Sequence, residues 1–481
     1  MIYIILNRKI FRYILAYFFC ISCPEVKMSD KKLLVDIGST FTKMVVVDLN
    51  REVVLSTVKA PTTANDDVTT GLLQAFRATE SQIGPLEDDM EIIACSSAAG
   101  GLRMVSIGLV PELSSEAAKR AALGAGAKIV GHYCHHVTRR EITLIETNAP
   151  DIILLAGGTD GGNNSAIIHN AVMLSRSQIN VPIVVAGNKC AYDKIEDIMK
   201  GSSKTAIFVE NVMPQIGRLE VRACREAIRE VFMENIIKAK GLDGARQFIG
   251  DIIMPTPAAV LNAAILLADG VNGESGVGEL IVVDVGGATT DVYSIAKGNP
   301  TSSTVLLRGL PEPYAKRTVE GDLGVRHNMD VLAELCSRKG IFTDKDIFSL
   351  FRENPGKIPV SESEFAFDAV LTSMAVETSF ERHTGKVEVV YGPHGEMVVQ
   401  TGKDLGGVDK VIGTGGPIIY SLDPHKVLAG ILAGSEKNNL LKPQNADFFI
   451  DKDYVMFAMG LLAWSEPQKA FHILKKALLP V

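Results

Sequence analysis

Two short motifs in this chain present carboxylates, glycines and hydroxyls in the same order. The first is Asp36-Ile-Gly-Ser-Thr-Phe-Thr-Lys43, and the second is Asp284-Val-Gly-Gly-Ala-Thr-Thr-Asp291. Each follows an apolar run typical of a buried strand, and each is continued by β-branched or aromatic residues. Each motif therefore predicts a strand, a tight glycine turn and a returning strand. Because the two agree in register, they indicate two related halves of the chain.

These residue types suit the binding of a phosphate group. Glycine lets backbone N–H groups approach an anion closely, Ser and Thr hydroxyls donate to its oxygens, and Lys43 adds a point charge. Carboxylates at the strand ends can hold the waters of a Mg²⁺ ion, which we expect of Asp36 and Asp284. One such motif alone is also an ordinary hairpin turn, and the repetition is what favours a ligand site. The candidate phosphate ligands are Gly38, Ser39, Thr40, Thr42, Lys43, Gly286, Gly287, Thr289 and Thr290.

A third glycine cluster follows a further predicted strand, in Lys410-Val-Ile-Gly-Thr-Gly-Gly-Pro417. Here Gly413, Gly415 and Gly416 would let the backbone lie flat against a ring, as an adenosine site requires. The cluster is weak evidence alone. Third in order behind two phosphate hairpins, it favours a nucleotide.

The elements that must position these loops alternate between strand and helix patterns, which indicates an α/β protein. The strands are expected at 33–36, 44–48, 91–94, 151–155, 181–186, 205–209, 280–284 and 410–413. The helices are expected at 67–80, 114–131, 163–177, 216–240, 257–269, 363–381 and 424–434.

With these motifs in order, the chain resembles the actin-like ATPase superfamily, which also holds sugar kinases and chaperone ATPases. The resemblance implies a duplicated ribonuclease-H-like fold, ATP and Mg²⁺. It makes Asp36, Asp284 and Asp291 the catalytic carboxylates, with Asp291 near the attacking water. The run that starts Met254-Pro-Thr-Pro resembles the first connecting helix, and residues 427–434 the second.

Two details of that resemblance concern the nucleotide and its turnover. Glu320-Gly-Asp-Leu-Gly324 is similar to a chaperone segment that borders the nucleotide, which implies that Glu320 and Asp322 contribute to binding. The chaperones carry an acidic residue before the proline of the connecting helix, where this chain has Met254. We therefore expect slow hydrolysis.

Residues 86–245 exceed the minimal actin-like fold and predict an inserted α/β subdomain. Their glycine-rich runs, including Leu154-Leu-Ala-Gly-Gly-Thr-Asp-Gly-Gly-Asn163, together with the two hairpin motifs resemble the MutL-type accessory proteins of glutamate mutase. That resemblance extends from Met28 to the C-terminus. It implies an ATP-driven chaperone that reactivates an adenosylcobalamin-dependent mutase, whose subunits are then the partners.

The first residues are far more apolar than the rest. The segment 1–27 is interpreted as an extension produced by a false start before Met28, with a signal or anchor as the alternative. If Met28 is the true start, we expect a cytoplasmic protein with no membrane partner. The expected division is 1–27 extension, 28–85 first actin-like half, 86–245 insertion, 246–270 first connecting helix, 271–434 second half and 435–481 C-terminal helical segment.

Composition bounds the other functions. The chain has 481 residues with 49 Lys and Arg against 56 Asp and Glu, a net charge of −7, so its bulk field does not favour nucleic acid. Seven scattered cysteines favour reduced thiols over a disulfide framework. Two alternatives to the chaperone stay open: a small-molecule kinase of the same fold, and a scaffold or filament ATPase.

Overall fold

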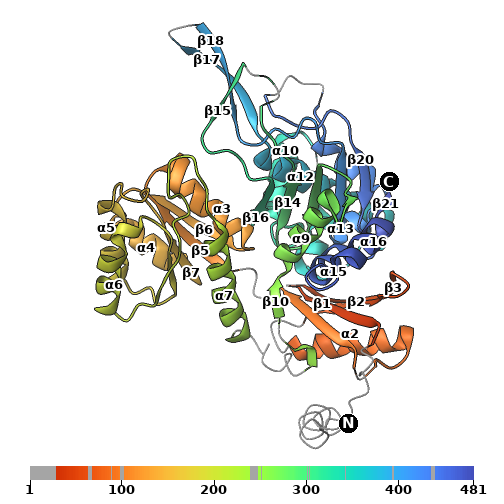
Figure 1. Cartoon of the computed structure of the whole chain (residues 1–481). Coiled ribbons are helices and arrows are strands. Elements are labelled where there is room, and N and C mark those ends of the chain that lie inside the picture. The colour runs from red at the N-terminus through yellow and green to blue at the C-terminus, as the bar shows by residue number, and fades with distance from the viewer. Residues whose placement is uncertain are drawn as a thin grey trace, which may run out of the picture.

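The structure is a computed structural model. It describes residues 29–38, 40–62, 68–87, 89–97, 102–238, 248–250, 252–300, 302, 304–341, 343–392, 395–434 and 439–481. A large body holds the first and last described strands, and a smaller body stands beside it (Figure 1). The extension 1–27 and Ser39 lie outside the described residues. In the part of the chain that the structure describes, no helix is long and apolar enough to cross a membrane.

The first sheet of the large body is built on the hairpin of the first motif. Its order in the described chain is β10-β4-β1-β2-β3. Strands β1, β2 and β3 are antiparallel neighbours, whereas β4 and β10 add in parallel on the other side of β1. Alternate residues such as Leu33, Val35 and Met44 pack into one core with helix α2. The elements are β1 (Lys31–Ile37), β2 (Phe41–Asp48), β3 (Val53–Pro61), α2 (Val68–Ile83), β4 (Glu91–Ser96) and β10 (Ile252–Pro255).

The second sheet repeats this plan around the second motif. Its order among the described strands is β16-β14-β13-β19-β20-β21, again with an antiparallel hairpin, an antiparallel outer strand and two parallel additions. Strands β3-β2-β1-β4-β10 thus correspond one by one to β16-β14-β13-β19-β20. This is the duplicated ribonuclease-H-like architecture of the actin-like fold. The strands are β13 (Leu280–Val285), β14 (Thr290–Ile295), β16 (Ala315–Glu320), β19 (Lys410–Thr414), β20 (Asp447–Ile450) and β21 (Leu479–Pro480).

Strands β4 and β10 show how the insertion is attached. They belong to the first sheet, although the expected division placed residues 91–96 in the insertion and 252–255 with the first connecting helix. The chain therefore leaves the first sheet after β4 and returns to it at β10.

Two helices cross between the sheets and share one apolar core with both. They are α9 (Thr256–Asp269), which begins at the Pro-Thr-Pro run, and α15 (Val455–Leu462). The prediction that 427–434 forms the second connecting helix is wrong. That segment forms only α14 (Pro424–Leu428) and a 3₁₀ turn at Ala429–Ile431, and α15 takes the place across α9.

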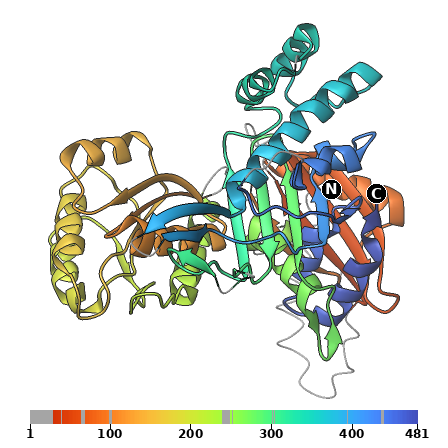
Figure 2. The same ribbon diagram turned by 90° about the horizontal axis from the view of Figure 1, so that it is seen from above.

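The remaining elements of the large body flank the second sheet. A three-stranded sheet of β15, β18 and β17 projects from it (Figure 1), and helices α10, α11 and α12 lie on another side (Figure 2). The helices are α10 (Met329–Arg338), α11 (Lys345–Glu353), α12 (Glu362–His383), α13 (Gly416–Ile419) and α16 (Pro467–Ala477). The strands are β11 (Gly270–Val271), β12 (Glu274–Ser275), β15 (Val305–Arg308), β17 (Lys386–Gly392) and β18 (Gly395–Thr401).

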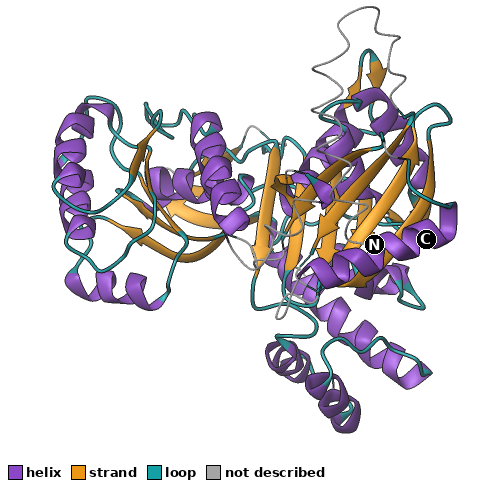
Figure 3. Ribbon diagram, turned by 90° about the horizontal axis from the view of Figure 1, so that it is seen from below, coloured by secondary structure: helices purple, strands orange, loops and turns teal. Residues whose placement is uncertain are grey.

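The insertion is a parallel α/β domain with helices around its sheet (Figure 3). Its described strands have the order β6-β5-β7-β8-β9, a doubly wound arrangement. The strands are β5 (Arg103–Gly108), β6 (Lys128–Cys134), β7 (Ile152–Leu155), β8 (Ile183–Val185) and β9 (Ala206–Phe208). The helices are η1 (Pro111–Ser115), α3 (Glu116–Gly124), α4 (Arg139–Thr147), α5 (Ser165–Ser175), η2 (Lys189–Ala191), α6 (Tyr192–Lys200) and α7 (Arg222–Lys238).

One predicted helix of the insertion is wrong in its second half. The segment 114–131 is helical only as far as Gly124, because the chain then turns and residues 128–134 pair with β5 as strand β6. The turn uses Gly126 at a φ of 91°, a conformation that glycine adopts without strain.

Candidate functional site

The two hairpins face a single cleft between the two sheets. The cleft holds about 1390 Å³ of empty space, part of which is open solvent, and the starts of α9 and α13 also line it. It therefore joins residues that are far apart in the sequence. The predicted site residues that line it are Asp36, Gly38, Thr40, Lys43, Asp284, Gly286, Gly287, Thr289, Asp291, Gly415 and Gly416.

Asp36 lies close to the turn of the first hairpin and is 1% exposed. It pairs in register with Lys43, whose Nζ lies 3.2 Å from Asp36 Oδ2. Thr256, at the start of α9, donates its hydroxyl to Asp36 Oδ1 at 2.5 Å, and the Cys95 thiol lies 3.7 Å from the same oxygen. The Asp36 carboxylate is thus held from the two strands that flank β1 and from a connecting helix.

Lys43 carries the positive charge of the cleft. Burial disfavours that charge, but the carboxylates of Asp36 and Asp284 outweigh it and raise the pKa of Lys43. Its Nζ also lies 4.7 Å from the ring centroid of Tyr454, a cation–π distance. The ammonium therefore stays charged and stands between the two hairpins.

Asp284 occupies the matching place in the second hairpin. Burial raises its pKa to about 7, against the opposing effect of Lys43, and the nearby carboxylates of Asp291, Asp36 and Asp451 add to the rise. Among the described residues it has no hydrogen-bond donor comparable to the Thr256 hydroxyl on Asp36. A half-buried carboxylate of this kind fits a cation, which would favour its charged form.

Asp291 pairs in register with Asp284, on the returning strand of the hairpin. Arg317 of β16 contacts its Oδ1 through Nε at 2.8 Å and Nη2 at 2.6 Å, and the Thr289 hydroxyl lies 3.3 Å from Oδ2. The carboxylate is therefore oriented by a guanidinium, and Oδ2 is its less engaged oxygen.

Two glycines of the third cluster are placed against this hairpin. Gly415 has a φ of 90°, and a Cβ there would lie 2.2 Å from the Val285 carbonyl oxygen and 2.7 Å from Asp284 Oδ1. At Gly416 the nearest atom to such a Cβ is the Tyr454 hydroxyl, at 3.4 Å. The backbone of this loop thus approaches the cleft closely at Gly415 and leaves room at Gly416.

Five other predicted site residues do not line the cleft. Thr42 hydrogen-bonds Thr62, Thr290 donates to the Leu323 carbonyl, and Gly413 lies inside β19 against Ile418. Glu320 and Asp322 accept hydrogen bonds from Arg382 of α12. A period of two along a strand explains Thr42 and Thr290, because neighbours of a cleft-facing residue point the other way. Ser39 lies outside the described residues.

The cleft also contains residues that the sequence analysis did not assign. Thr256 belongs to the Pro-Thr-Pro run, which was identified only as a helix start. Tyr454 and the ion pair of Arg326 with Asp368, at 2.5 Å, line the cleft as well. Tyr454 carries no motif of its own, and neither does Arg317, which contacts Asp291 but does not line the cleft. Only their contacts identify these two residues.

The two related sheets, with one motif hairpin in each and a cleft between them, define an actin-like ATPase fold. Comparison with known proteins then gives the family. A family model described as MutL protein matches residues 32–478. The protein named Protein MutL of Clostridium tetanomorphum is 47% identical over 465 residues, covering 94% of this chain and 100% of the relative. The chain belongs to the MutL protein family.

Solved structures with some similarity include kinases. The match to a ROK hexokinase from Thermus thermophilus covers 93% of this chain and 99% of the hexokinase chain, with 12% identity and a TM-score of 0.25. The match to a xylulose kinase from Bifidobacterium adolescentis covers 92% of this chain and 93% of the kinase chain, with 11% identity and a TM-score of 0.29. These scores are low, so the fold assignment rests on the strand order and not on the neighbours.

Proposed function

We propose that this protein binds ATP with Mg²⁺ in the cleft and hydrolyses it slowly, as an accessory and reactivating chaperone for an adenosylcobalamin-dependent mutase such as glutamate mutase. The observation that carries the nucleotide part is the meeting of Asp36, Lys43 and Asp284 in one cleft. Two carboxylates and one ammonium from two hairpins match a metal-bound polyphosphate in both charge and hydrogen-bonding groups.

Asp36 and Asp284 are the groups that would hold magnesium, through its waters. When bound, the metal would neutralise phosphate charge. Lys43 would contribute its ammonium to the terminal phosphates, and the backbone of the two glycine turns would donate N–H groups. The loop of Gly415 and Gly416 would accommodate the adenosine.

The carboxylates of the cleft support hydrolysis over transfer to a metabolite. Asp36 is engaged by Thr256 and Lys43, Asp291 by Arg317, and Asp368 by Arg326. Asp291 Oδ2 is the acceptor we assign to the attacking water. Met254 is buried and does not line the cleft, so no acidic side chain enters from that position. Asp284 is the least engaged of these carboxylates and is assigned to the metal. One oriented acceptor, Asp291 Oδ2, then remains for the water, which suits slow turnover.

The partner is inferred from the family. Membership of the MutL family and a doubly wound insertion attached beside the cleft support a protein that grips a client while its two halves move with the nucleotide. Nucleotide can drive such motion only through different affinities for the open and closed states. The overall negative charge does not favour nucleic acid as the client. With Met28 as the start of the chain, we place the protein in the cytoplasm.

A reactivation assay tests this function. A mutase inactivated during turnover is incubated with intact adenosylcobalamin and this protein, with and without MgATP. We expect activity to return only with MgATP, and Lys43→Ala to abolish the rescue while complex formation persists. Lys476→Ala, which removes a charge outside the cleft, is the matched control.

Two results would contradict the chaperone function. Equal rescue without nucleotide would indicate a passive scaffold. Steady phosphorylation of a small metabolite would indicate a kinase.

A further inference from the structure

One buried arginine touches both the second hairpin and the insertion. Arg317 of β16 is 5% exposed. Its Nε and Nη2 contact Asp291 Oδ1, while its Nη1 donates to the carbonyl oxygen of Leu123 at 3.0 Å and lies 3.3 Å from that of Ala127. A single planar guanidinium thus connects a cleft carboxylate with the C-terminal end of helix α3.

A cation at the C-terminal end of α3 stabilises the last turn of that helix, and its loss destabilises the turn. The last carbonyls of a helix have no partner within the helix and carry partial negative charge, so a cation there is favourable. The Leu123 carbonyl also accepts the N–H of Gly126, and the N–H groups of Ala125 and Ala127 bond back to Ala121 and Ala122. Arg317 therefore caps the turn that leads from α3 into strand β6 of the insertion.

We propose that Arg317 couples the second phosphate hairpin to the inserted domain, by holding Asp291 and the C-terminal cap of α3 with one guanidinium. The proposal rests on the proposed function, because the signal is the binding of nucleotide beside Asp291. Arg317 is a positioning residue, since it acts through Asp291 and does not line the cleft. Nucleotide that orders Asp291 fixes the guanidinium, and the fixed guanidinium tightens the α3 cap.

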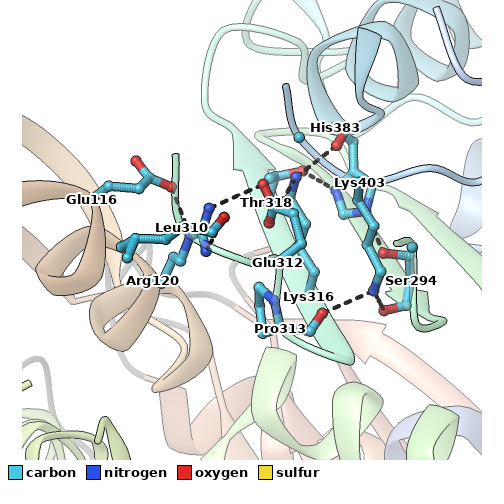
Figure 4. Close-up of polar contacts among 12 residues, drawn as sticks. Glu116, Arg120, Ser294, Leu310, Glu312, Pro313, Lys316, Thr318, His383 and Lys403 are labelled. Carbon is cyan, nitrogen blue, oxygen red and sulfur yellow. Dashed lines mark hydrogen bonds and ion pairs between the residues drawn. The ribbon is translucent and has the colours of Figure 1, made fainter. Parts of the chain in front are cut away.

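The same interface offers a matched control in Arg120. This residue of α3 is also largely buried and joins the insertion to the second half (Figure 4). It binds Glu116 at 3.0 Å, Glu312 at 3.1 Å and the Pro311 carbonyl at 2.6 Å. Arg120 therefore holds the two bodies together without touching Asp291. Removing the Arg120 side chain weakens the interface and leaves the contacts of Arg317 with Asp291 and with the end of α3 in place.

Hydrogen exchange at the amides of Ala125, Gly126 and Ala127 measures the cap directly. On adding Mg²⁺ with a non-hydrolysable ATP analogue, we expect the exchange rate of these amides in the full chain to fall at least about fivefold. A fivefold change is the lower end of the couplings typically measured between two sites. Arg317→Gln abolishes this nucleotide-dependent change. Arg317→Lys also abolishes it, because a point charge beside Asp291 lacks the fork that reaches both partners. Arg120→Gln retains it.

Calorimetry on the same samples separates the two proposals. If the wild-type chain binds no nucleotide, the proposed function fails. If it binds and the three amides do not respond, or if both Arg317 variants retain the response, the coupling is refuted. A loss of the response in Arg120→Gln as well would assign the coupling to the whole interface and overturn the role of Arg317. Should Arg317→Gln fail to fold, Arg317→Lys keeps the charge next to Asp291 and carries the test.

Discussion

Gly460 of α15 and Ala259 of α9 are in backbone contact where the two connecting helices cross. A Cβ built on Gly460 would lie 1.8 Å from the Ala259 carbonyl oxygen. Ala259 is itself completely buried, so neither backbone has room to withdraw. The approach of the two halves of the molecule is therefore set by a residue without a side chain.

Gly460→Ala is expected to destabilise the protein. Overpacking in a tight core costs roughly 1–3 kcal/mol, and here the obstacle is backbone on both sides. The unfolding midpoint in a denaturant titration measures the loss. Gly407→Ala is the control, because no atom lies within 4 Å of a Cβ at that position. Equal midpoints for the two variants would contradict the close crossing.

Alanine substitutions at the adjacent positions Gly415 and Gly416 are expected to affect nucleotide affinity differently. Gly415→Ala requires a strained positive φ and brings a Cβ against Val285 and the Asp284 carboxylate, so we expect nucleotide affinity to be lost. Gly416→Ala meets only the Tyr454 hydroxyl at 3.4 Å and is expected to bind nearly as the wild type does. Isothermal titration with MgATP compares them. Similar affinity for both variants would remove the third loop from the site.

Thr256→Val tests the hydroxyl on Asp36. The substitution keeps the shape but leaves a buried carboxylate without its 2.5 Å donor, which costs about 1–3 kcal/mol. We expect lower stability and weaker Mg²⁺-dependent nucleotide binding, and Thr256→Ser should restore both. Thermal unfolding and titration calorimetry measure the two effects. Failure of the serine variant to recover would mean that the methyl group, and not the hydroxyl, matters.

The raised pKa of Asp284 predicts that the protein loses stability as the pH rises. A salt-bridged carboxylate, whose pKa is lowered, would have the opposite effect. Its pKa is about 7 in the folded protein, whereas an unfolded Asp titrates near pH 4, so the fold holds a proton that the unfolded chain releases. Its contribution to stability therefore falls as pH rises from about 4 to about 7. The Asp284→Asn variant has no titrating group at this position, so its stability does not fall for this reason.

The measurement for Asp284 is the difference in unfolding midpoint between the variant and the wild type, at pH 5 and at pH 8 without Mg²⁺. We expect the difference to shift in favour of Asp284→Asn at the higher pH. Asp451, whose pKa burial raises to about 6, titrates in both proteins and contributes to both midpoints. The variant should also lose Mg²⁺-dependent ATP binding while remaining folded. A difference that does not change with pH would contradict a raised pKa of Asp284.

The sequence by itself determined the two hairpins and their chemistry. Asp36 faces Lys43 and Asp284 faces Asp291 because each pair brackets a short glycine turn, and a hairpin register follows from turn length. The strand periods and the repeated motif were likewise local signals. The duplicated fold could be predicted for that reason.

Only the tertiary structure decided which other side chains reach those hairpins. Thr256 and Tyr454 meet Asp36 and Lys43 through helices that cross between the sheets, and no spacing in the sequence encodes that crossing. Glu320 and Asp322 resembled a nucleotide segment, yet they bind Arg382 of α12 and do not line the cleft. Long-range packing selects a side chain's partner among all that could pair with it. A charge is therefore recognisable in the sequence, and its partner is known only once the chain has folded.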